Sequence, residues 1–354
     1  MKFKINKKII SEKSSTYFIA DIAANHDGNI KKAFELIYEA KKAGADAAKF
    51  QHFSAETIVS DKTFSSMRSK LSHQSQWKKS VFQVYKEASL NLDWTSSLYK
   101  HCKKIGIDFF TSPYSVELVD HVDNYVPAYK IGSGDITWLE IIKHISKKKK
   151  PVILATGASN LNDVSRAIRE IKKYNNKICV MQCNTNYTAS KNNFNFINLN
   201  VLKTYKKNFK NVILGLSDHT HGHATVLGAI ALGAKIIEKH FTLSNDDKGP
   251  DHKFSMTPKT WREMVEASRE LELSMGTDIK KIEKNELNTC VVQRRSMHFK
   301  KDYRANEKLK IKDLIPLRPC LEGSVQPYEI HKIKNKKIKK KKLRGEILLW
   351  KDLK

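Results

Sequence analysis

Short apolar runs and longer amphipathic stretches alternate eight times between residue 16 and about residue 275. Each run is almost continuously apolar at its centre, as expected of a parallel strand that is buried on both faces. The runs are 16–22, 47–53, 108–114, 128–134, 151–157, 177–184, 212–218 and 235–242. Eight strand–helix units predict an α/β chain folded as a (β/α)8 TIM barrel. A doubly wound open sheet is the alternative, but it would not require eight units.

The stretches between the runs have helical periodicity. In 30–43, apolar residues recur at helical spacing before Gly44, which is suited to ending a helix. In 160–173, Asn160 or Asn162 can cap a helix whose apolar residues form one stripe. Residues 54–76 are longer than a barrel turn needs, and we expect them to form an active-site loop.

The character of the sequence changes after about residue 280. Short strand-like pieces and turn residues replace the long amphipathic stretches. We therefore expect a barrel domain over 1–280 and a small β-rich domain over 285–354. A unit of that size buries a limited core and gains from docking against a partner.

The net charge of +28 comes mainly from lysines scattered along the chain. Only 331–344 is a true basic block, and it lacks the interleaved aromatics of a base-stacking surface. We interpret it as solvated surface, with weak polyanion binding as the alternative, and expect no specific nucleic-acid partner. The odd cysteine number, a charged N-terminus and the lack of a long apolar run predict a cytoplasmic protein without a membrane span.

Polar residues gather where the predicted strands end. In a closed barrel these carboxyl ends meet at one mouth, which is where barrel enzymes carry their catalytic groups. The residues concerned are Asp21, Asn25, His26, Lys49, Gln51, His52, Thr111, Ser112, Lys130, Ser133, Asp135, Thr156, Asn184, Thr185, Tyr187, Ser217, Asp218, His219, Lys239 and His240. Asp251, in the loop after the last strand, faces the same mouth. Together they predict one polar site.

His219 and His240 end neighbouring strands at matching depth. Two imidazoles can bind a divalent metal, with a carboxylate, substrate oxygens and water completing its shell. Two hydrogen-bonded structural histidines are the alternative. With only two protein nitrogens, a loosely held octahedral ion such as Mn²⁺ or Mg²⁺ is expected rather than structural zinc. Mn²⁺ is the expected ion, and Mg²⁺ or Co²⁺ are the alternatives to it.

Lys49 and Lys130 lie inside apolar strands, where an ammonium group needs an anionic partner. They can pair with Asp21 or Asp135, clamp a phosphate, or form a Schiff base if the lysine pKa is depressed. Asp21 and Asp135 are in turn candidate acid/base groups.

The ordered set of motifs resembles the sialic acid synthase family, whose members make N-acetylneuraminate, legionaminate or pseudaminate. In this chain the matching residues cover about 16–353. The tail resembles the family's antifreeze-like (SAF) C-terminal domain. The motifs are IADIAANHDG (19–28), GADAAKFQ (44–51), FFTSPY (109–114), YKIGSGD (129–135), ILATG (153–157), GLSDHT (215–220), EKHFT (238–242), GPDHKFSM (249–256), CVVQRRSM (290–297) and LRPCLEGSVQP (317–327).

The resemblance implies a metal-dependent condensation of phosphoenolpyruvate with an amino-sugar aldehyde, followed by water addition and loss of phosphate through C–O cleavage. It implies that His219 and His240 hold the metal. Phosphoenolpyruvate would be bound by Lys49, Thr111, Lys130, Ser133 and Ser217. The sugar would be oriented by Gln51, Tyr187 and Asp251. Arg318 would reach the barrel mouth of another subunit, which implies a domain-exchanged homodimer.

Four positions depart from the family's usual pattern. Asp21 and Asp135 stand where glutamate is usual, which shortens each carboxylate by one methylene. Ala155 replaces a frequent serine and Thr185 a frequent asparagine at the substrate site. These changes bear on which sugar is used more than on the reaction. The nearest rival, a 3-deoxy-octulosonate phosphate synthase, would have no reason to carry the C-terminal domain.

Overall fold

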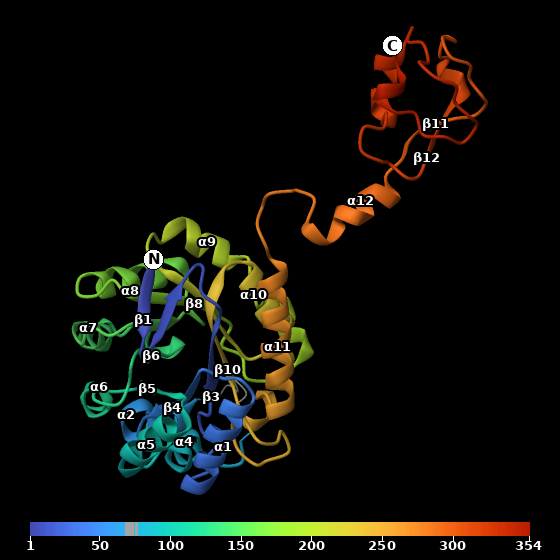
Figure 1. Ribbon diagram of the computed structural model, residues 1–354. Coiled ribbons are helices and arrows are strands. Elements are labelled where there is room, and N and C mark those ends of the chain that lie inside the picture. The colour runs from blue at the N-terminus through green and yellow to red at the C-terminus, as the bar shows by residue number, and fades with distance from the viewer. Residues whose placement is uncertain (68–73, 75–76) are drawn as a thin grey trace. The chain divides into compact units, whose positions relative to one another are not determined.

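The computed structural model describes residues 1–67, 74 and 77–354. The chain divides into two compact units, Met1–Gly276 and Thr277–Lys354. The first unit contains eight parallel strands in the order β5-β4-β3-β10-β9-β8-β7-β6. The two ends of this order, β5 and β6, lie against each other, so the sheet closes into a barrel (Figure 1). The predicted TIM barrel is confirmed.

All eight predicted apolar runs form strands. They are β3 (Tyr17–Asp21), β4 (Ala47–His52), β5 (Asp108–Pro113), β6 (Tyr129–Ile131), β7 (Val152–Ala155), β8 (Ile178–Cys183), β9 (Ile213–Asp218) and β10 (Ala234–His240). Eight helices alternate with these strands: α1 (Ile30–Lys42), α5 (Thr95–Ile105), α6 (Val116–Val122), α7 (Leu139–Lys147), α8 (Leu161–Lys172), α9 (Val201–Asn208), α10 (Ala224–Ala231) and α11 (Pro258–Ser274).

Helix α8 shows how local sequence sets these elements. Asn160 is the N-cap, and its side chain accepts hydrogen bonds from the amides of Asn162 and Asp163. This satisfies backbone donors that the first helical turn leaves unpaired. The predicted apolar stripe is buried along one face of the helix, through Val164, Ala167, Ile168 and Ile171.

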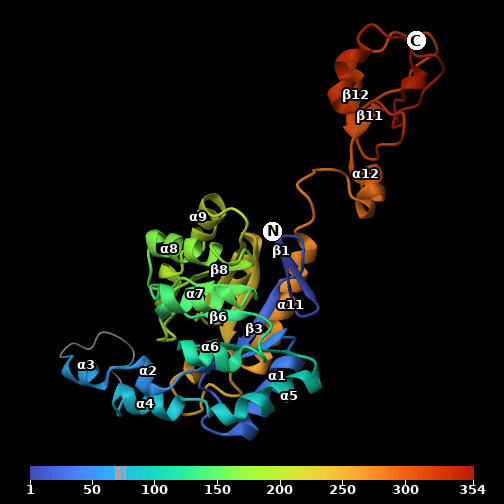
Figure 2. The ribbon, with the colours of Figure 1, turned by 90° about the vertical axis from the view of Figure 1, so that its left-hand side faces the viewer.

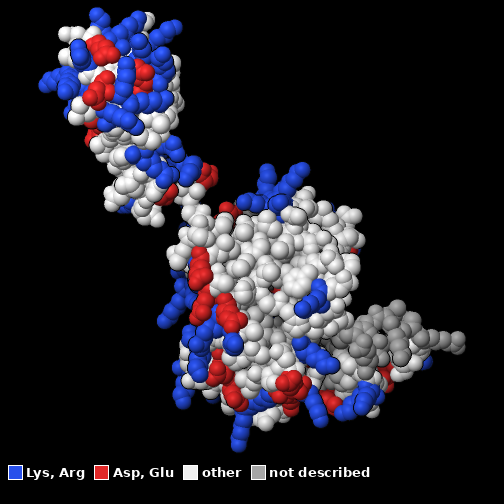
Figure 3. Space-filling model, turned by 90° about the vertical axis from the view of Figure 1, so that its right-hand side faces the viewer, with Lys and Arg blue, Asp and Glu red and all other residues white. Residues whose placement is uncertain are grey.

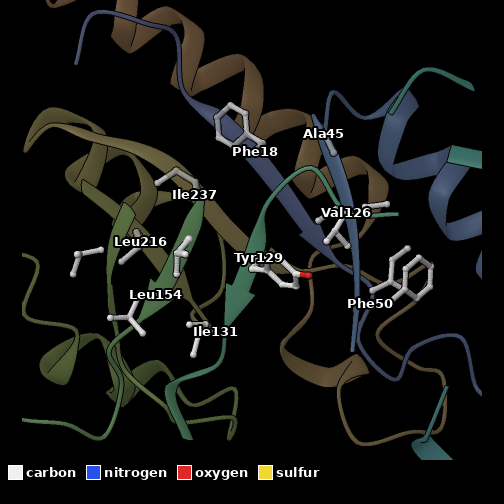
Figure 4. Close-up of a cluster of buried hydrophobic side chains, with 14 of the residues drawn as sticks. Phe18, Ala45, Phe50, Val126, Tyr129, Ile131, Leu154, Leu216 and Ile237 are labelled. Carbon is white, nitrogen blue, oxygen red and sulfur yellow. The ribbon is translucent and has the colours of Figure 1, made fainter. Parts of the chain in front are cut away.

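The hydrophobic core has two layers in the barrel unit. One lies between the sheet and the helices, and Figure 4 shows Phe18, Phe50, Leu154 and Ile237 pointing into it. The other fills the barrel interior with the opposite faces of the same strands. Strand side chains alternate between faces, so neighbouring residues enter different layers. This alternation also decides which strand residues reach the mouth of the barrel.

An N-terminal hairpin contributes to the inner core. It comprises β1 (Lys2–Ile5) and β2 (Lys8–Ser11), paired antiparallel. Phe3, Ile5 and Ile10 are buried with barrel-interior residues. Asn6 bonds Asp108, at the amino end of β5, so the hairpin covers the amino end of the barrel. The sequence did not predict this hairpin, because four-residue strands with alternating lysines resemble a charged leader.

The two faces of the hairpin provide a matched stability test. Ile5 is fully buried, whereas Ile9 is 55% exposed. Ile5→Ala is expected to lower the free energy of unfolding by about 2–4 kcal/mol, because it leaves a cavity in the barrel interior. Ile9→Ala is expected to change it by less than about 0.5 kcal/mol. Urea titrations of both variants measure the difference, and equal losses would contradict the covering role.

Among the described residues between β4 and α5 are three short α-helices. They are α2 (Ala55–Ile58), α3 (Asp61–Ser66) and α4 (Val81–Ala88). Figure 2 shows them together at one edge of the barrel unit, away from β1. The loop expected over 54–76 is therefore partly helical, while 68–73 and 75–76 of it lie outside the described residues.

The second unit has its own small core. It contains α12 (Leu287–Gln293) and the antiparallel strands β11 (Ser296–Phe299) and β12 (Leu314–Leu317), and further isolated β-bridges tie its loops together. The basic block is part of this fold, since Ile333 and Ile338 are buried in the core. Figure 3 shows many cationic side chains on one face of this unit.

No helix in the described part of the chain combines the length and the apolar character that crossing a membrane requires.

Candidate active site

The carboxyl ends of the barrel strands surround a cavity of about 460 Å³. Of the residues expected to bind substrate or metal or to exchange protons, all but Thr111 and Arg318 line it. Of the other polar residues at the strand ends, Ser112 lines it, and Asn25, His26, His52, Thr156, Asn184, Asp218 and Lys239 do not. The residues brought together are Asp21, Lys49, Gln51, Lys130, Ser133, Asp135, Thr185, Tyr187, Ser217, His219, His240 and Asp251. They come from strands, or loops after strands, spread over more than 200 positions of the chain.

Two buried lysines and two buried carboxylates form the base of the cavity. The Lys49 Nζ lies 2.6 Å from the Asp21 Oδ2 and 3.9 Å from the Glu238 Oε2. The Lys130 Nζ lies 3.2 Å from the Glu238 Oε1. Burial alone would lower the pKa of Lys49, but Asp21 and Glu238 outweigh it and raise the pKa. The Lys49 ammonium therefore stays charged, whereas a Schiff-base lysine needs a depressed pKa.

Glu238 is the site residue that the sequence analysis missed. It accepts a hydrogen bond from Ser217 at 3.2 Å, and its Oε2 has no hydrogen-bond partner among the described residues. The available signal was its spacing. Glu238 precedes His240 by two residues in the same strand, and this spacing puts both side chains on one face. Glu238 lines the cavity together with His240.

Asp21 connects the base of the cavity to its wall. Its Oδ2 accepts a hydrogen bond from Gln51 at 3.2 Å and lies 3.6 Å from the His240 Nε2. Its Oδ1 accepts from the Ala23 amide at 3.1 Å. The shorter aspartate therefore reaches a lysine, an amide and an imidazole at once.

The two histidines face each other across β9 and β10, with ring centroids 5.3 Å apart. Aromatic edges hold the rings in place. The Tyr187 ring packs on the His219 ring, with the ring centroids 4.5 Å apart. The Phe254 ring packs on the His240 ring, with the centroids 4.8 Å apart. The His219 Nδ1 is 3.0 Å from the Asn184 carbonyl and donates there, which orients the ring and leaves Nε2 for other partners.

The donor set fits a divalent metal. Burial, followed by the nearby His219 and Lys49, holds the pKa of His240 well below its usual value, so this imidazole is neutral and can act as a ligand. The buried His240 Nδ1 has no hydrogen-bond partner among the described residues. An unsatisfied buried nitrogen is costly unless a ligand completes it. Asp21 and the carbonyl that orients His219 supply the supporting interactions such ligands usually have.

Cys183 also faces the cavity, next to His219. Burial raises the pKa of a thiol, but the hydrogen bond from His219 outweighs it and the pKa of Cys183 is lowered. The same contact raises the pKa of His219 against the effect of burial. Cys183 and His219 are therefore electrostatically coupled.

Two further acids have raised pKa values. Burial raises the pKa of Asp135 to about 6, although Lys130 opposes the shift. Burial also raises the pKa of Asp251 to about 6, against a hydrogen bond from the Ala24 amide. Both carboxyl groups titrate near neutral pH, which suits groups that exchange protons with a substrate.

Asp251→Asn tests this shift through stability. A carboxyl whose pKa rises on folding contributes stability below its unfolded pKa, and that contribution is lost as the pH rises through about 6. We expect the variant to have a higher Tm than the parent at pH 8, by about 2–4 °C per kcal/mol recovered, and an equal Tm at pH 4. Asp246→Asn, an exposed change in the same loop, is the control. A pH-independent difference measured by calorimetry would contradict the shift.

Gly157 lets the backbone approach the base of the cavity. Its amide donates to the Ser133 Oγ at 2.9 Å. A Cβ at this position would lie 1.8 Å from the Thr185 Oγ1 and 3.1 Å from the Cys183 Sγ. The Thr185 hydroxyl, which belongs to a residue that lines the cavity, occupies the space that a side chain would need.

Thr111 does not reach the cavity. Its Oγ1 bonds the His52 Nδ1 at 2.7 Å and the Phe50 carbonyl at 3.1 Å, on the helix-facing side of the sheet. The next residue, Ser112, lines the cavity and lies 3.5 Å from the Lys49 Nζ. The expectation placed the hydroxyl on the wrong face, because the sequence marks where a strand ends but not which face each residue takes.

Arg318 belongs to the second unit, where its side chain is exposed. All the residues that line the cavity therefore belong to the barrel unit.

A separate group of possible metal ligands lies outside the cavity. It consists of Asp27, Asp247 and His252. The Lys32 ammonium bridges the two carboxylates at 2.5 and 2.7 Å, and the His252 Nδ1 bonds Thr242. The Lys32 ammonium already pairs with both acids, so we interpret the cluster as a structural ion-pair network.

Comparisons with known proteins agree with this geometry. Residues 36–280 match the NeuB family. An N,N'-diacetyllegionaminic acid synthase of Campylobacter jejuni is 35% identical, over 93% of this chain and 98% of that protein. A pseudaminic acid synthase of the same species is 31% identical, over 90% of this chain and 89% of that protein.

A solved structure shares the fold. It is the N-acetylneuraminic acid synthetase of Leptospira borgpetersenii, with a TM-score of 0.72 at 24% identity, covering 82% of this chain and 95% of that one. The extent of the match and the identities to the two Campylobacter enzymes show that this chain belongs to the NeuB family.

Proposed function

We propose that this chain condenses phosphoenolpyruvate with the open-chain aldehyde of an N-acetylated amino sugar to give a nonulosonic acid of the sialic acid type. One observation supports this most strongly. Two buried ammonium groups, two buried carboxylates and two facing imidazoles share a single cavity at the carboxyl end of the barrel. The named activities of the Campylobacter relatives agree with it.

The base of the cavity suits phosphoenolpyruvate. Lys49 and Lys130 supply charge, and Ser133 and Ser217 supply neutral donors beside them. Charge-assisted hydrogen bonds to a phosphate or carboxylate are about twice as strong as neutral ones. Ser112 stands in the position expected for Thr111.

His219 and His240 would hold a divalent metal, with Mn²⁺ as our choice and Mg²⁺ or Co²⁺ as alternatives. A bound ion would supply Lewis-acid polarisation of the sugar aldehyde. Tyr187 and Phe254 keep both rings oriented towards the cavity, and Asn184 fixes the tautomer of His219.

The reaction balances without a further reactant. C3 of phosphoenolpyruvate bonds to the aldehyde carbon, and the aldehyde oxygen takes a proton. Water adds to the electron-poor C2 and loses a proton to give a C2 hydroxyl. The C2–O bond to phosphate then breaks as this hydroxyl becomes the C2 ketone, and its proton leaves with the phosphate. Asp135, with a pKa of about 6, can exchange these protons, while Asp21 remains beside Lys49.

The outer part of the cavity is where the sugar would lie. Gln51, Thr185, Tyr187 and Asp251 offer it hydrogen bonds. The segment after β4 adds an apolar wall opposite these groups, formed by Phe53, Ile58, Trp77, Val84, Tyr85 and Ala88. Burying an apolar CH₂ group contributes about 0.8 kcal/mol, so an apolar wall favours methyl groups over hydroxyls. We therefore favour a 2,4-diacetamido-trideoxy hexose over N-acetylmannosamine.

Phosphate release tests the function. The protein is mixed with Mn²⁺, phosphoenolpyruvate and either N-acetylmannosamine or a 2,4-diacetamido-trideoxy hexose. We expect release only when a sugar is present, with the higher kcat/KM for the diacetamido sugar. If phosphate is released with neither of the two sugars, the proposed reaction is refuted. Borohydride trapping with pyruvate would reveal the alternative, a Schiff-base aldolase.

We also propose a domain-exchanged homodimer in the cytoplasm. The segment that opens the second unit exposes apolar side chains suited to burial against another chain: Ile279, Ile282, Leu287, Val291 and Val292. Arg318 is exposed and free to serve a partner's cavity. All five cysteines are free thiols, as in a reducing compartment.

A mixing experiment tests the exchange. Arg318→Ala and His240→Ala are each expected to lose sugar-dependent turnover, the first mainly through weaker sugar use. Co-refolded at equal amounts, they should recover about a quarter of parental activity, because half the dimers are mixed and each mixed dimer has one intact site. Zero recovery, with dimers present, would show that Arg318 acts within its own chain, and parental turnover by Arg318→Ala alone would show that it has no part in the reaction.

A further inference from the structure

A buried ion pair stands directly behind the two imidazoles of the cavity. Asp218 precedes His219 at the end of β9, and Lys239 precedes His240 at the end of β10. Asp218 and Lys239 are register partners in the parallel ladder. Because strand side chains alternate, the histidines face the cavity while this pair faces α10. Neither Asp218 nor Lys239 lines the cavity.

The pair also holds the backbone that leaves His219. The Lys239 ammonium bonds the Asp218 carboxylate and donates to the Thr220 carbonyl at 2.6 Å. The Asp218 carboxylate accepts from the Thr220 amide at 3.3 Å and from its hydroxyl at 2.8 Å. Thr225 of α10 adds a hydroxyl at 2.8 Å. Both polar backbone groups of Thr220 are therefore fixed by the pair.

Stability alone does not account for this arrangement. The two side chains are only 1% and 0% exposed, so both charges have left water entirely. Well-packed apolar residues often replace a buried ion pair with no loss of stability, whereas charged partners impose one geometry. The geometry imposed here is the relative position of β9 and β10 at the point where each strand presents an imidazole.

We propose that Asp218 and Lys239 are positioning residues that set the spacing of His219 and His240, and so the affinity of the cavity for a divalent metal. The inference rests on the proposed metal at these imidazoles. Partners behind metal ligands typically change metal affinity by about 10–100-fold. Neither residue touches the substrate or a reacting atom in this scheme.

The double variant Asp218→Asn/Lys239→Met tests the proposal. It removes both charges together and keeps similar side-chain sizes, so no unpaired charge remains to unfold the protein. Isothermal titration of metal-free protein with Mn²⁺ is expected to show about 10–100-fold weaker binding. Turnover should recover as Mn²⁺ is raised, while the KM for phosphoenolpyruvate at saturating Mn²⁺ stays within about twofold.

Thr95→Val is the matched control. Thr95 is 1% exposed and bonds the His52 Nε2 at 2.9 Å, on the same outer side of the sheet but away from both metal-binding imidazoles. We expect it to lower the Tm and to leave Mn²⁺ affinity unchanged.

Two outcomes separate the possible failures. A folded double variant that binds Mn²⁺ as tightly as the parent would overturn the positioning role alone. If His240→Ala also keeps parental Mn²⁺ affinity, the ion binds elsewhere, and the proposed metal site fails together with the inference.

Discussion

His240→Ala is expected to lower phosphate release from phosphoenolpyruvate and sugar by at least about 10³-fold, because the several kcal/mol contributed by a Lewis acid would be lost. The imidazole is buried and neutral, its Nδ1 has no other hydrogen-bond partner among the described residues, and Phe254 holds it towards the cavity. A neutral imidazole with an unpaired nitrogen and a fixed orientation is what a metal ligand requires.

The measurement is turnover at saturating Mn²⁺, with circular dichroism to show that the variant is folded. His221→Ala is the control, since His221 lies two residues after His219, is exposed and bonds the Ala189 carbonyl. It should retain parental activity. Full turnover by a folded His240→Ala protein would remove His240 from the site.

Lys130→Met is expected to weaken phosphoenolpyruvate binding by about 10²–10³-fold. The estimate corresponds to the loss of one or two charge-assisted hydrogen bonds, each worth about 1.5–3 kcal/mol. Lys130 is 3% exposed and lies 3.2 Å from Glu238, which Lys49 approaches only to 3.9 Å. Its loss therefore also leaves a buried carboxylate poorly neutralised, which further repels an anionic ligand.

Isothermal titration with phosphoenolpyruvate measures this loss directly. Lys235→Met is the matched control, because Lys235 belongs to β10 but lies near its amino end, away from the cavity. The affinity of Lys235→Met for phosphoenolpyruvate should match that of the parent protein. Near-parental affinity in folded Lys130→Met would assign the anion to Lys49 alone.

Much of the site could be predicted, because the order of strands along the chain shows which residues end each strand and closure of the barrel brings those ends together. Once eight strands were recognised, the residue types after each strand identified the mouth of the barrel. That reasoning located Lys49, Lys130, His219 and His240. It also extended to Thr111, where it failed, since a strand end read from sequence has an uncertainty of a residue and each residue shift changes the face. Ser112 lines the cavity instead.

Glu238 was missed for a different reason. In sequence it is one acid among many, next to the motif that supplied His240. Its importance comes from lysines 108 and 189 positions away, which approach it only in the closed barrel. The hairpin over residues 2–11 was missed similarly, because its short strands are stabilised by burial in the barrel interior.

The sequence by itself determined the kinds and order of the elements, because apolar periodicity and helix caps act between neighbouring residues. It also determined which chemical groups lie near each strand end. Only the tertiary structure decided which of those groups share the cavity, which carboxyls are buried enough to titrate near pH 6, and that Asp218 and Lys239 meet behind the imidazoles. These depend on the register and closure of the barrel, which set distances and dielectric environment across the whole chain.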